Sequence, residues 1–314
     1  MRQRALGSSN VTLSELSLGT WQLAGEGHPP TSSQARAALL ERARSLGIGA
    51  FECADSYAHG EVLGQLGEVL GNDSTVRFIC LIGTDRESMP PRKRFDKEYL
   101  QRALERALQR LRREQLDILL LHNPSVQAFQ REATFEWLRG LPKAGAVHTW
   151  GVSVGSPEVA KLATEYGAPV VQVAYNALHT EELDAITPAV LEKGIGILAR
   201  SVLAHGLLCG LWPRDKEFPP GDHRNERWTP DELRRRIQQL DALRPAIGGD
   251  VPSLRAVALR YALASELVSS VVVGPRTALQ LDQLVREANV APPYLPGEKL
   301  RALEGRLKDV GARP

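Results

Sequence analysis

Eight short apolar runs recur along the chain, and longer amphipathic segments separate them. The runs are rich in Val, Ile and Leu, which is typical of strands covered on both faces of a parallel sheet. Strands that alternate with segments of helical length predict parallel βα units, and eight such units close most simply into a barrel. The expected strands are Leu16–Leu18, Ile48–Cys53, Phe78–Thr84, Ile118–Leu121, Val147–Ser153, Val170–Ala174, Ile195–Ala199 and Ser270–Val273.

The connections between the strands are mostly of helical length. Within Lys97–Arg113, apolar residues recur at helical spacing and charged residues take the opposite face, which predicts an outer helix. The segment Trp212–Thr229 differs, because it is long and rich in proline and charge, and such a loop is typically functional. Further helices are expected at Glu158–Tyr166, Pro230–Leu243 and Ser253–Leu263.

The length of 314 residues suits one α/β barrel, which ordinarily takes about 250 residues and more with insertions. We therefore predict an α/β fold of the (β/α)8 TIM barrel type, as a single domain over residues 1–314. The loop 212–229 is expected to lie over the carboxyl-terminal face of this barrel, where such barrels place their active sites.

The charge and composition exclude several kinds of partner. A formal net charge of +2, with arginines scattered among acids, argues against nucleic acid. No segment reaches the ~20 apolar residues of a membrane span, and the first ten residues lack a signal-peptide core, which predicts a cytoplasmic protein. Cysteines and histidines are not at metal-ligand spacing, so no metal is expected. The expected partner is a small-molecule substrate, and the oligomeric state stays open.

Polar residues that follow the apolar runs are the first candidates for a site, because they share the carboxyl-terminal rim of a barrel. Some of them, such as Ser153, Asn176 and Ser201, could equally cap a helix or bind loop backbone. Together the rim residues supply acids, an imidazole, phenols and guanidinium groups. The others are Thr20, Trp21, Glu52, Asp55, Tyr57, Asp85, His122, Asn123, Gln172, Tyr175, Arg200, Arg276 and Thr277.

The order of these residues resembles the aldo-keto reductases, in particular the bacterial branch related to the potassium-channel β subunits. The segment 51–57, Phe-Glu-Cys-Ala-Asp-Ser-Tyr, followed by Gly60 and Glu61, is similar to that family's F-D-T-A-x-x-Y-G-x-G-E signature. The segment 117–124 resembles the strand that ends in the catalytic histidine, and 199–208 resembles A-R-V-P-L-A-S-G-L-L. Similar matches run nearly end to end, at 18–21, 151–153, 171–176, 218–224 and 273–277.

The resemblance implies a reaction in which NADPH delivers hydride to a carbonyl carbon while a tyrosine protonates the oxygen. It implies that Tyr57 is this tyrosine, that His122 orients the carbonyl, and that Glu52 stands where the family has an aspartate. The implied substrate pocket contains Trp21, Asn123, Trp212 and Trp228. The implied NADP(H) site contains Thr20, Ser153, Gln172, Tyr175, Arg200, Gly274, Arg276, Thr277 and Gln280.

The family's lysine, whose charge eases proton transfer from the tyrosine, has no counterpart at the end of the third strand. No lysine occurs before Lys93. The preferred alignment sets 83–85 against the family's A-T-K and places Asp85 in the lysine position. The alternative sets 80–83 against T-K-x-G and places Leu81 there. Either residue removes the cation, and Asp85 would raise the pKa of Tyr57.

Two further positions weaken the expected cofactor site. Val154 stands where the family has an asparagine against the nicotinamide, and Leu284 stands where an asparagine meets the adenine. Each lost polar partner costs about 1–3 kcal/mol at a buried site. NADP(H) binding is therefore expected to be weakened or absent.

Three functions fit this pattern. The preferred hypothesis is an enzyme of acid–base chemistry, such as dehydration, elimination or isomerisation, acting on a small carbonyl or sugar-like substrate. The second is an NADPH-dependent reductase in which His122 or Arg200 replaces the lysine electrostatically. The third is a non-catalytic binding or regulatory barrel, since a fold does not fix a function. In the first hypothesis the catalytic residues are Glu52, Tyr57, Asp85 and His122.

Overall fold

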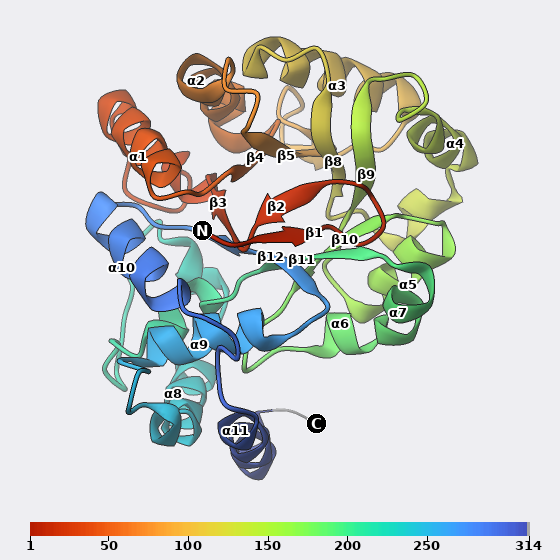
Figure 1. Cartoon of the computed structure of the whole chain (residues 1–314). Helices are drawn as coiled ribbons and strands as arrows, with labels where there is room; N and C mark the ends of the chain where they lie inside the picture. The colour runs from red at the N-terminus through yellow and green to blue at the C-terminus, as the bar shows by residue number, and fades with distance from the viewer. Residues whose placement is uncertain (313–314) are drawn as a thin grey trace.

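Eight parallel strands close into a barrel in the computed structural model, which describes residues 1–312 (Figure 1). All eight predicted strands are present, and some of their ends differ by a few residues from the predicted ones. The predicted domain extends to Pro314, so its last two residues lie outside the described part of the chain. The barrel strands are β3 (Leu16–Gly19), β4 (Ala50–Ala54), β5 (Arg77–Ile82), β8 (Leu116–His122), β9 (Val147–Ser153), β10 (Val170–Ala174), β11 (Gly196–Arg200) and β12 (Val268–Val273).

The strands follow one another around the barrel in chain order, and β12 pairs with β3 to close it. Every neighbouring pair within the barrel is parallel. Most strand residues are buried, which explains why the strands appear in the sequence as continuous apolar runs rather than alternating ones. The predicted (β/α)8 barrel is confirmed.

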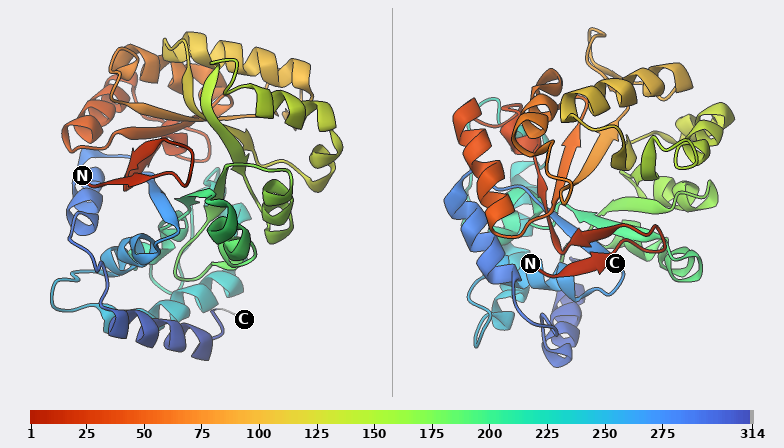
Figure 2. Two further views of the ribbon diagram at one scale, coloured as in Figure 1. Left: turned by 45° about the vertical axis from the view of Figure 1, so that its right-hand side comes forward. Right: turned by 45° about the horizontal axis from the view of Figure 1, so that its top comes forward.

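Helices cover the outside of the barrel (Figures 1 and 2). Helix α3 begins after Asp96, whose side chain accepts a hydrogen bond from the backbone N of Tyr99. It ends before Arg112, whose left-handed φ of 55° stops it short of the predicted end at Arg113. Among residues 1–312, no helix combines the length and the apolar character needed to cross a bilayer. The helices are α1 (Ser33–Ser45), α2 (Glu61–Leu70), α3 (Lys97–Leu111), α4 (Glu132–Gly140), α5 (Pro157–Glu165), α6 (Glu181–Asp184), α7 (Thr187–Lys193), α8 (Pro230–Gln239), α9 (Leu254–Ala264), α10 (Ala278–Ala288) and α11 (Gly297–Asp309).

Helix α8 follows the long loop 212–229 directly. Thr229 caps it in a reciprocal arrangement with Glu232, in which each side chain accepts a hydrogen bond from the other residue's backbone N. The α-helix ends at Gln239, and the rest of the predicted helix Pro230–Leu243 continues as the 3-10 turn Leu240–Ala242. The loop therefore ends at the capped amino terminus of α8.

Two β-hairpins lie outside the barrel sheet, and the sequence analysis does not predict them. The first pairs β1 (Gln3–Ala5) with β2 (Thr12–Ser14) and crosses the amino-terminal end of the barrel, in front of the strands in Figure 1. The second pairs β6 (Thr84–Asp85) with β7 (Arg92–Lys93), directly after β5.

Strand β5 ends at Ile82, although the sequence predicts it through Thr84. The reason is Gly83, whose φ of +119° is open to glycine and strained for other residues. A Cβ at this position would lie 2.4 Å from the ring of Phe95. The chain therefore leaves the barrel at Gly83 and enters the β6–β7 hairpin.

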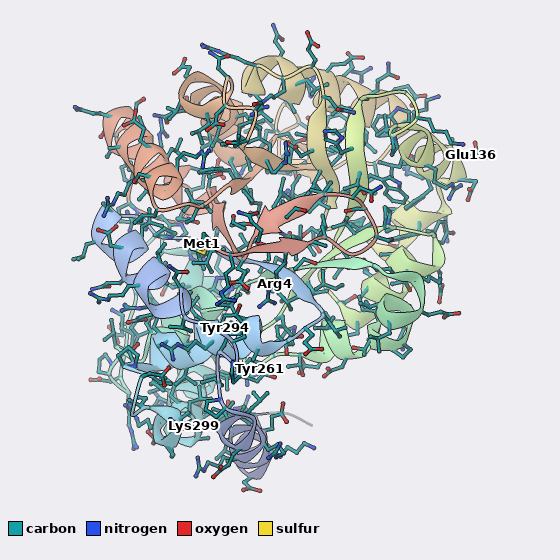
Figure 3. All side chains as sticks on the ribbon, viewed as in Figure 1. Met1, Arg4, Glu136, Tyr261, Tyr294 and Lys299 are labelled. Atoms are coloured by element: carbon teal, nitrogen blue, oxygen red, sulfur yellow. The ribbon has the colours of Figure 1, made fainter. Side chains whose placement is uncertain are left out.

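The β1–β2 hairpin is fixed by a polar cluster of Arg4, Glu15 and Tyr294, here called the basal cluster. Arg4 and Tyr294 are labelled in Figure 3. Arg4 Nε donates to Glu15 Oε1 at 2.8 Å, and the Tyr294 hydroxyl donates to the same oxygen. Arg4 also donates to the backbone oxygens of Leu263 and Val268, each at 2.8 Å. The cluster thereby joins the hairpin to α9 and β12.

Candidate active site

Tyr57 and His122 lie together at the carboxyl-terminal end of the barrel. Tyr57 opens the helical turn that follows β4, and His122 is the last residue of β8. Their ring centroids are 6.2 Å apart, and the rings are nearly perpendicular at 89°. Ala58 and His59, the two residues after Tyr57, have left-handed φ values of 48° and 52°, a conformation that is strained and clusters at functional sites.

Both side chains are neutral near pH 7. Burial raises the pKa of Tyr57 well above its ordinary value; Glu52 raises it further, and Arg200 opposes the rise. Burial lowers the pKa of His122 to about 3, and the charges of Lys93 and Arg200 contribute to the lowering. The buried Nδ1 atom of His122 has no hydrogen-bond partner among the described residues. A protonated phenol therefore lies beside a neutral imidazole that has a nitrogen left for a ligand.

Glu52, Gln172 and Ser153 form one buried chain of hydrogen bonds across β4, β10 and β9. Gln172 Nε2 donates to Glu52 Oε2 at 2.5 Å, and Ser153 Oγ donates to Gln172 Oε1 at 2.6 Å. Burial raises the pKa of Glu52, against the opposing effects of this hydrogen bond and of Arg200. Both ends of the Gln172 amide, which the resemblance assigns to the cofactor, are thus engaged within the protein.

Arg200 brings a guanidinium group to the same rim. It donates to the backbone oxygen of Val154 at 2.6 Å and to Ser201 Oγ at 3.2 Å. The buried carboxylate of Glu182 lies 3.9 Å away. Arg200 therefore balances part of the negative charge that surrounds Tyr57.

Asp85 is engaged by its own hairpin. Its carboxylate accepts a hydrogen bond from the Arg94 guanidinium at 3.2 Å. It also accepts hydrogen bonds from the backbone N atoms of Glu87 and Ser88, at 3.0 and 3.2 Å. Although desolvation opposes it, these bonds hold the pKa of Asp85 below its ordinary value. The contacts disagree with the preferred alignment, because the turn at Gly83 takes the chain out of the barrel before Asp85.

The strand register favours the alternative alignment, with Leu81 in the lysine position. Glu52 pairs with Ile79 across β4 and β5, and Leu81 lies two residues further along β5. Because side chains alternate along a strand, Leu81 faces the same side of the sheet as Glu52. An apolar side chain thus stands where the resemblance implies an ammonium group.

Lys93 reaches the site from the β6–β7 hairpin. It pairs with Thr84 in the hairpin, and its Nζ atom donates to Thr84 Oγ1 and to the backbone oxygen of His122, each at 2.8 Å. Lys93 is exposed as a residue, but its ammonium end is packed against the rim, and desolvation there lowers its pKa to about 8, against the opposing charge of Asp55. The sequence analysis does not predict Lys93 as a site residue, because it searches for the lysine only within the third strand. The Pro90–Pro91 pair, which favours a turn, is the signal that the chain could fold back.

Asp55 completes this side of the opening. Its Oδ2 atom accepts hydrogen bonds from the backbone N of Gly83 at 3.2 Å and from the Tyr99 hydroxyl at 3.4 Å. Its Oδ1 atom is buried and has no partner among the described residues. Burial raises the pKa of Asp55 to about 6, although the Gly83 N–H and the charge of Lys93 oppose the rise.

Two other predicted cofactor residues make contacts within the rim. Thr20 Oγ1 donates to the backbone oxygen of Glu52 at 2.8 Å. The backbone N of Tyr175 donates to the backbone oxygen of Arg200 at 3.1 Å. The Tyr175 ring stacks on Tyr261, with centroids 5.7 Å apart. Thr20 therefore fixes the backbone of β4, and Tyr175 lies beside the end of β11.

The segment 274–280 combines the amino terminus of α10 with a guanidinium group. Thr277 Oγ1 caps the helix by accepting from the backbone N of Gln280. The backbone N of Arg276 donates to Gln280 Oε1 at 2.8 Å, and its Nη2 donates to the backbone oxygen of Pro29 at 2.8 Å. The Nε atom of Arg276 is buried without a partner among the described residues. A Cβ at Gly274 would lie 2.6 Å from Gln22, so the backbone packs closely here.

The loop 212–229 meets the loop after β3 in a group of rings. The Trp21 ring lies 4.9 Å from that of His28 and 4.7 Å from that of His223, and Trp212 lies 6.1 Å from Trp228. Three of the four predicted pocket residues are thus in one place; Asn123, the fourth, follows His122. The group, here called the ring cluster, contains Trp21, His28, His205, Trp212, Phe218, His223 and Trp228.

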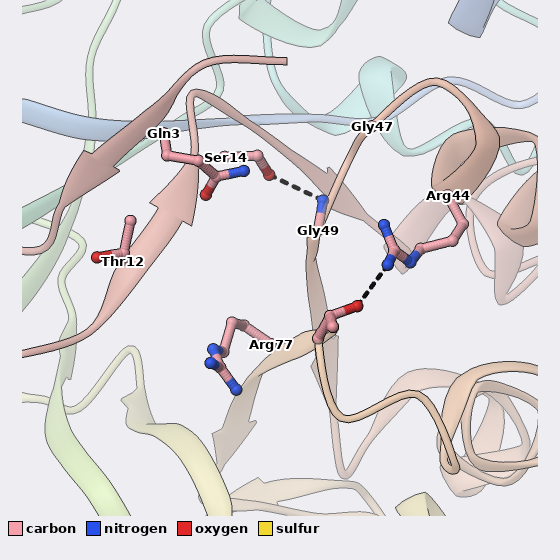
Figure 4. A pocket seen from close by; sticks show the side chains of 8 residues that line it. Gln3, Thr12, Ser14, Arg44, Gly47, Gly49 and Arg77 are labelled. Carbon is pink, nitrogen blue, oxygen red and sulfur yellow. Dashed lines mark hydrogen bonds between the residues drawn. The ribbon is translucent and has the colours of Figure 1, made fainter.

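Two hollows lie at the other end of the barrel, beside the β1–β2 hairpin. The first is a cavity of about 150 Å³ that contains Arg44 and Arg77 (Figure 4). Both arginines are already paired, Arg44 with Asp73 at 2.7 Å and Arg77 with Asp117 at 3.2 Å. Because α/β barrels carry their chemistry at the carboxyl ends of the strands, we place the site at Tyr57 and not in these hollows. Residues 1–312 contain no group of three acidic, histidine or cysteine side chains placed to hold a metal ion.

Solved structures with the same fold cover nearly the whole chain. The structure is similar to a glycerol dehydrogenase from Gluconobacter oxydans, with a TM-score of 0.85 and 21% identity over 99% of this chain and 97% of that one. It is also similar to an aldo-keto reductase from Bacillus halodurans in its holo form, with a TM-score of 0.81 and 21% identity over 98% and 96% of the two chains.

Relatives of known sequence are similar over most of their length. The L-glyceraldehyde 3-phosphate reductase of Escherichia coli (strain K12) is 26% identical over 92% of this chain and 88% of its own. A protein of Oryza sativa subsp. japonica, named as a probable voltage-gated potassium channel subunit beta, is 26% identical over 94% of both chains. The family model described as "Aldo/keto reductase family" matches residues 15–293, so the chain belongs to the aldo/keto reductase family.

Proposed function

We propose that the protein is an NADP(H)-dependent oxidoreductase of small carbonyl or sugar-like compounds. The observation that carries this proposal is the pair of neutral side chains Tyr57 and His122, whose rings lie 6.2 Å apart at the carboxyl-terminal rim. Proton donation needs a phenol that still holds its proton, and burial keeps Tyr57 in that form. Orientation of a carbonyl oxygen needs a hydrogen-bond donor, and the ring of His122, which burial keeps neutral, holds one N–H group.

Each side chain has one role in this proposal. Tyr57 donates its hydroxyl proton to the carbonyl oxygen, and the nearby Arg200 lowers the cost of the negative charge that remains on the phenol oxygen. His122 binds the carbonyl oxygen through a ring nitrogen and holds it within reach of Tyr57. The hydride for the carbonyl carbon would come from NADPH when it is bound. In the reverse direction Tyr57 takes up the proton of an alcohol.

The residues present fit the phosphate end of NADP(H) better than its nicotinamide end. The amino terminus of α10, with the unpartnered Nε of Arg276 and the cap at Thr277, is suited to an anion such as the 2′-phosphate. At the other end, Gln172 must give up its bond to Glu52 before it can hold a carboxamide. We therefore expect binding that depends strongly on Arg276 and weakly on Gln172.

The ring cluster suggests the kind of substrate. Trp21, Trp212 and Trp228 offer apolar faces with polar ring edges, which suit a small molecule that carries hydroxyl groups. The similarity to a glycerol dehydrogenase and to an L-glyceraldehyde 3-phosphate reductase agrees with this class. Sugar-like aldehydes and ketones are therefore the first substrates to try.

Acid–base chemistry without redox is the second candidate, and one observation favours it. Gln172 is engaged at both ends by Glu52 and Ser153, so its amide is not free to hold a carboxamide. Glu52 and Tyr57 would then serve as base and acid in an elimination or isomerisation. Asp85 is no longer part of this candidate, because its carboxylate is held by the β6–β7 hairpin.

The test begins with titration of the protein with NADPH, followed by nicotinamide fluorescence. We expect Arg276→Ala to weaken binding by about tenfold or more, because a charge-assisted bond to phosphate contributes about 1.5–3 kcal/mol. Arg286→Ala, an exposed change near the other end of α10, is the matched control and should leave the affinity unchanged.

The same protein is then assayed with a panel of small and sugar-like carbonyl compounds. Tyr57→Phe should lower kcat/KM by about 10²–10⁴-fold and leave NADPH affinity unchanged, since the lost hydroxyl acts in proton transfer. Reduction that survives in Tyr57→Phe would contradict the proposal. No NADPH binding at millimolar concentration, together with elimination or isomerisation that needs Tyr57, would support the second candidate instead.

A further inference from the structure

The phenol of Tyr57 is surrounded by negative charge. Besides burial, Glu52 and Asp55, which lie before it on the same segment, both raise the pKa of Tyr57, and Arg200 lowers it. At the strand position where an ammonium group is expected, β5 carries Leu81. A tyrosine that must give up and regain a proton therefore needs a second cation from elsewhere in the chain.

The β6–β7 hairpin brings a lysine to the backbone of His122, at the same rim. Gly83 turns the chain out of the barrel, and the antiparallel pairing of Thr84 with Lys93 brings the chain back beside the end of β5. The Lys93 ammonium then lies 2.8 Å from the backbone oxygen of His122, at the end of the neighbouring strand β8. Lys93 is thus held at the rim by a hydrogen bond to each of two segments.

Asp55 is the carboxylate whose charge acts on Lys93, at a longer range than the two hydrogen bonds that Lys93 makes to Thr84 and His122. Each group shifts the other's pKa toward the charged form, and Asp55 also keeps a buried Oδ1 atom without a partner among the described residues. Asp55 lies two positions before Tyr57, and Lys93 touches the backbone of His122. The pair therefore stands beside both members of the proposed catalytic couple.

We propose that Lys93, paired in charge with Asp55, is the positioning residue that takes over from the missing strand-end lysine, acting from a hairpin outside the barrel. It offsets the carboxylate of Asp55 beside Tyr57 and keeps His122 neutral and fixed through its backbone oxygen. The inference rests on the proposed function for its kinetic part. Its electrostatic part is measured on the protein alone.

The alkaline side of the pH profile follows from this placement. The pKa of Lys93 is lowered to about 8, so its ammonium is present below that pH and is lost as the pH rises through it. Activity should therefore fall above about pH 8, long before an ordinary lysine loses its proton. Lys93 faces two titratable groups, Asp55 after β4 and His122 on β8. The other charged or titratable groups around these three residues are Arg86 in the hairpin, Tyr99 and Arg106 on α3, and Arg200 on β11.

A purely structural role for Lys93 is the alternative that the variants must separate. Lys93→Gln keeps hydrogen-bond donors for Thr84 and His122 but removes the charge, whereas Lys93→Arg keeps the charge. Arg92→Gln removes a neighbouring charge from the same strand of the hairpin, at an exposed position, and serves as the matched control.

The kinetic experiment compares kcat/KM against pH for these three variants. We expect Lys93→Gln to lose about tenfold or more and to lose the fall in activity near pH 8, while NADPH affinity stays within twofold. Lys93→Arg should recover most of the rate and keep a flat profile through pH 9. Arg92→Gln should behave like the unchanged protein. A Lys93→Gln profile that still falls near pH 8 would overturn the inference.

The second experiment needs no turnover. Lysine Nζ signals are titrated by NMR in protein labelled at lysine, and the Lys93 signal is identified by its absence in Lys93→Arg. We expect it to titrate near pH 8, and to titrate lower in Asp55→Asn, which removes the charge that raises the pKa of Lys93. A Lys93 signal that titrates above pH 10, or is unmoved in Asp55→Asn, would refute the pairing. A protein that reduces no carbonyl but passes this titration would refute the proposed function and leave the charge pair standing.

Discussion

The basal cluster of Arg4, Glu15 and Tyr294 and the rim around Tyr57 and His122 bury polar groups in opposite ways. In the basal cluster the carboxylate of Glu15 accepts from both partners, and Arg4 also donates to two backbone oxygens. At the rim, Asp55 Oδ1 and His122 Nδ1 are buried and have no partner among the described residues. Both regions pack against the same barrel, so the difference lies in how completely each one satisfies its own polar atoms.

This difference teaches where the molecule is built for stability and where it is built for a ligand. A buried polar atom without a partner costs about 1–3 kcal/mol, and a fold tolerates that cost where another molecule supplies the bond. The pKa values at the rim agree with this interpretation. Burial moves the pKa of Asp55 up to about 6 and that of His122 down to about 3, both away from the charged form.

The largest effect is expected in the basal cluster. Arg4→Ala leaves the Glu15 carboxylate buried with Tyr294 alone, and breaking a buried pair in this way destabilises a protein by about 3–5 kcal/mol. The thermal midpoint should fall by several degrees, while kcat/KM of the folded protein stays unchanged. Arg2→Ala, at an exposed position beside the same strand, is the control and should change stability by less than about 0.5 kcal/mol.

If Arg4→Ala and Arg2→Ala have the same thermal midpoint, the hydrogen bonds of the basal cluster add nothing to the stability of the fold. The basal cluster would then not be a stabilising region, and the contrast with the rim would not hold. A loss of activity in folded Arg4→Ala would break it differently, because it would couple the amino-terminal end to the rim.

A smaller effect of the opposite sign is expected at the rim. Asp55 has a pKa of about 6 in the folded protein, above its ordinary value, so its charged form destabilises the fold. Asp55→Asn should therefore stabilise the protein at pH 8 by about 1–3 kcal/mol. The gain should be complete above about pH 6, shrink as the pH falls, and vanish below about pH 4, where the carboxyl is protonated in both states.

Denaturant unfolding of the two proteins at pH 4, 6 and 8 measures this difference. The same change should move the alkaline fall in kcat/KM to a lower pH, because it removes the charge that raises the pKa of Lys93. A variant that is less stable at pH 8 would show that Asp55 is a satisfied structural carboxylate, like Glu15, and would remove the contrast between the two regions.

The contrast also explains what the sequence predicts and what it does not. Strand cores are predictable, because burial on both faces leaves continuous apolar runs such as Ile118–Leu121. Tyr57, His122 and Arg200 are predictable as rim residues, because each follows or ends a strand and parallel strands end on one rim. These strands and rim residues can be predicted from local sequence patterns, without knowing which strands pair with each other.

The rest depends on chain reversals that leave a weak local signal. Lys93 becomes part of the rim through a hairpin whose start is set by the positive φ of Gly83, and the same turn moves Asp85 out of the barrel. His28 and His223 are far apart in the sequence, and only the packing of two loops brings their rings to 4.6 Å. The spacing of residues in the sequence predicts neither the position of Lys93 at the rim nor the contact between His28 and His223.

The smallest effect concerns the ring cluster. Its histidines are less fully hydrogen-bonded than the basal cluster and more exposed to loop contacts than the rim around Tyr57 and His122. Burial lowers the pKa of His205 to about 3 and that of His223 to about 4, and it also lowers the pKa of His28. Because these pKa values lie below the ordinary value of about 6.5, the neutral rings stabilise the closed loops above that pH. This stability should be lost progressively as the pH falls from 6.5 toward 4. The charged groups around these histidines are Arg200, Asp222, Arg224, Arg227 and Arg276.

Hydrogen exchange of the loop 212–229 at pH 7 and pH 5, corrected for the intrinsic rate, tests this expectation. Protection in the unchanged protein should fall by a few fold at pH 5, because a charged ring beside Arg227 is unfavourable in the closed arrangement. His205→Phe should keep its protection at pH 5, since it retains an aromatic ring that cannot be protonated. His148→Gln, an exposed change on β9, is the control and should follow the unchanged protein. Equal protection at both pH values would mean that the loop is held by contacts such as the Asp222–Arg224 pair, at 2.5 Å, and that the ring cluster belongs with the satisfied basal cluster.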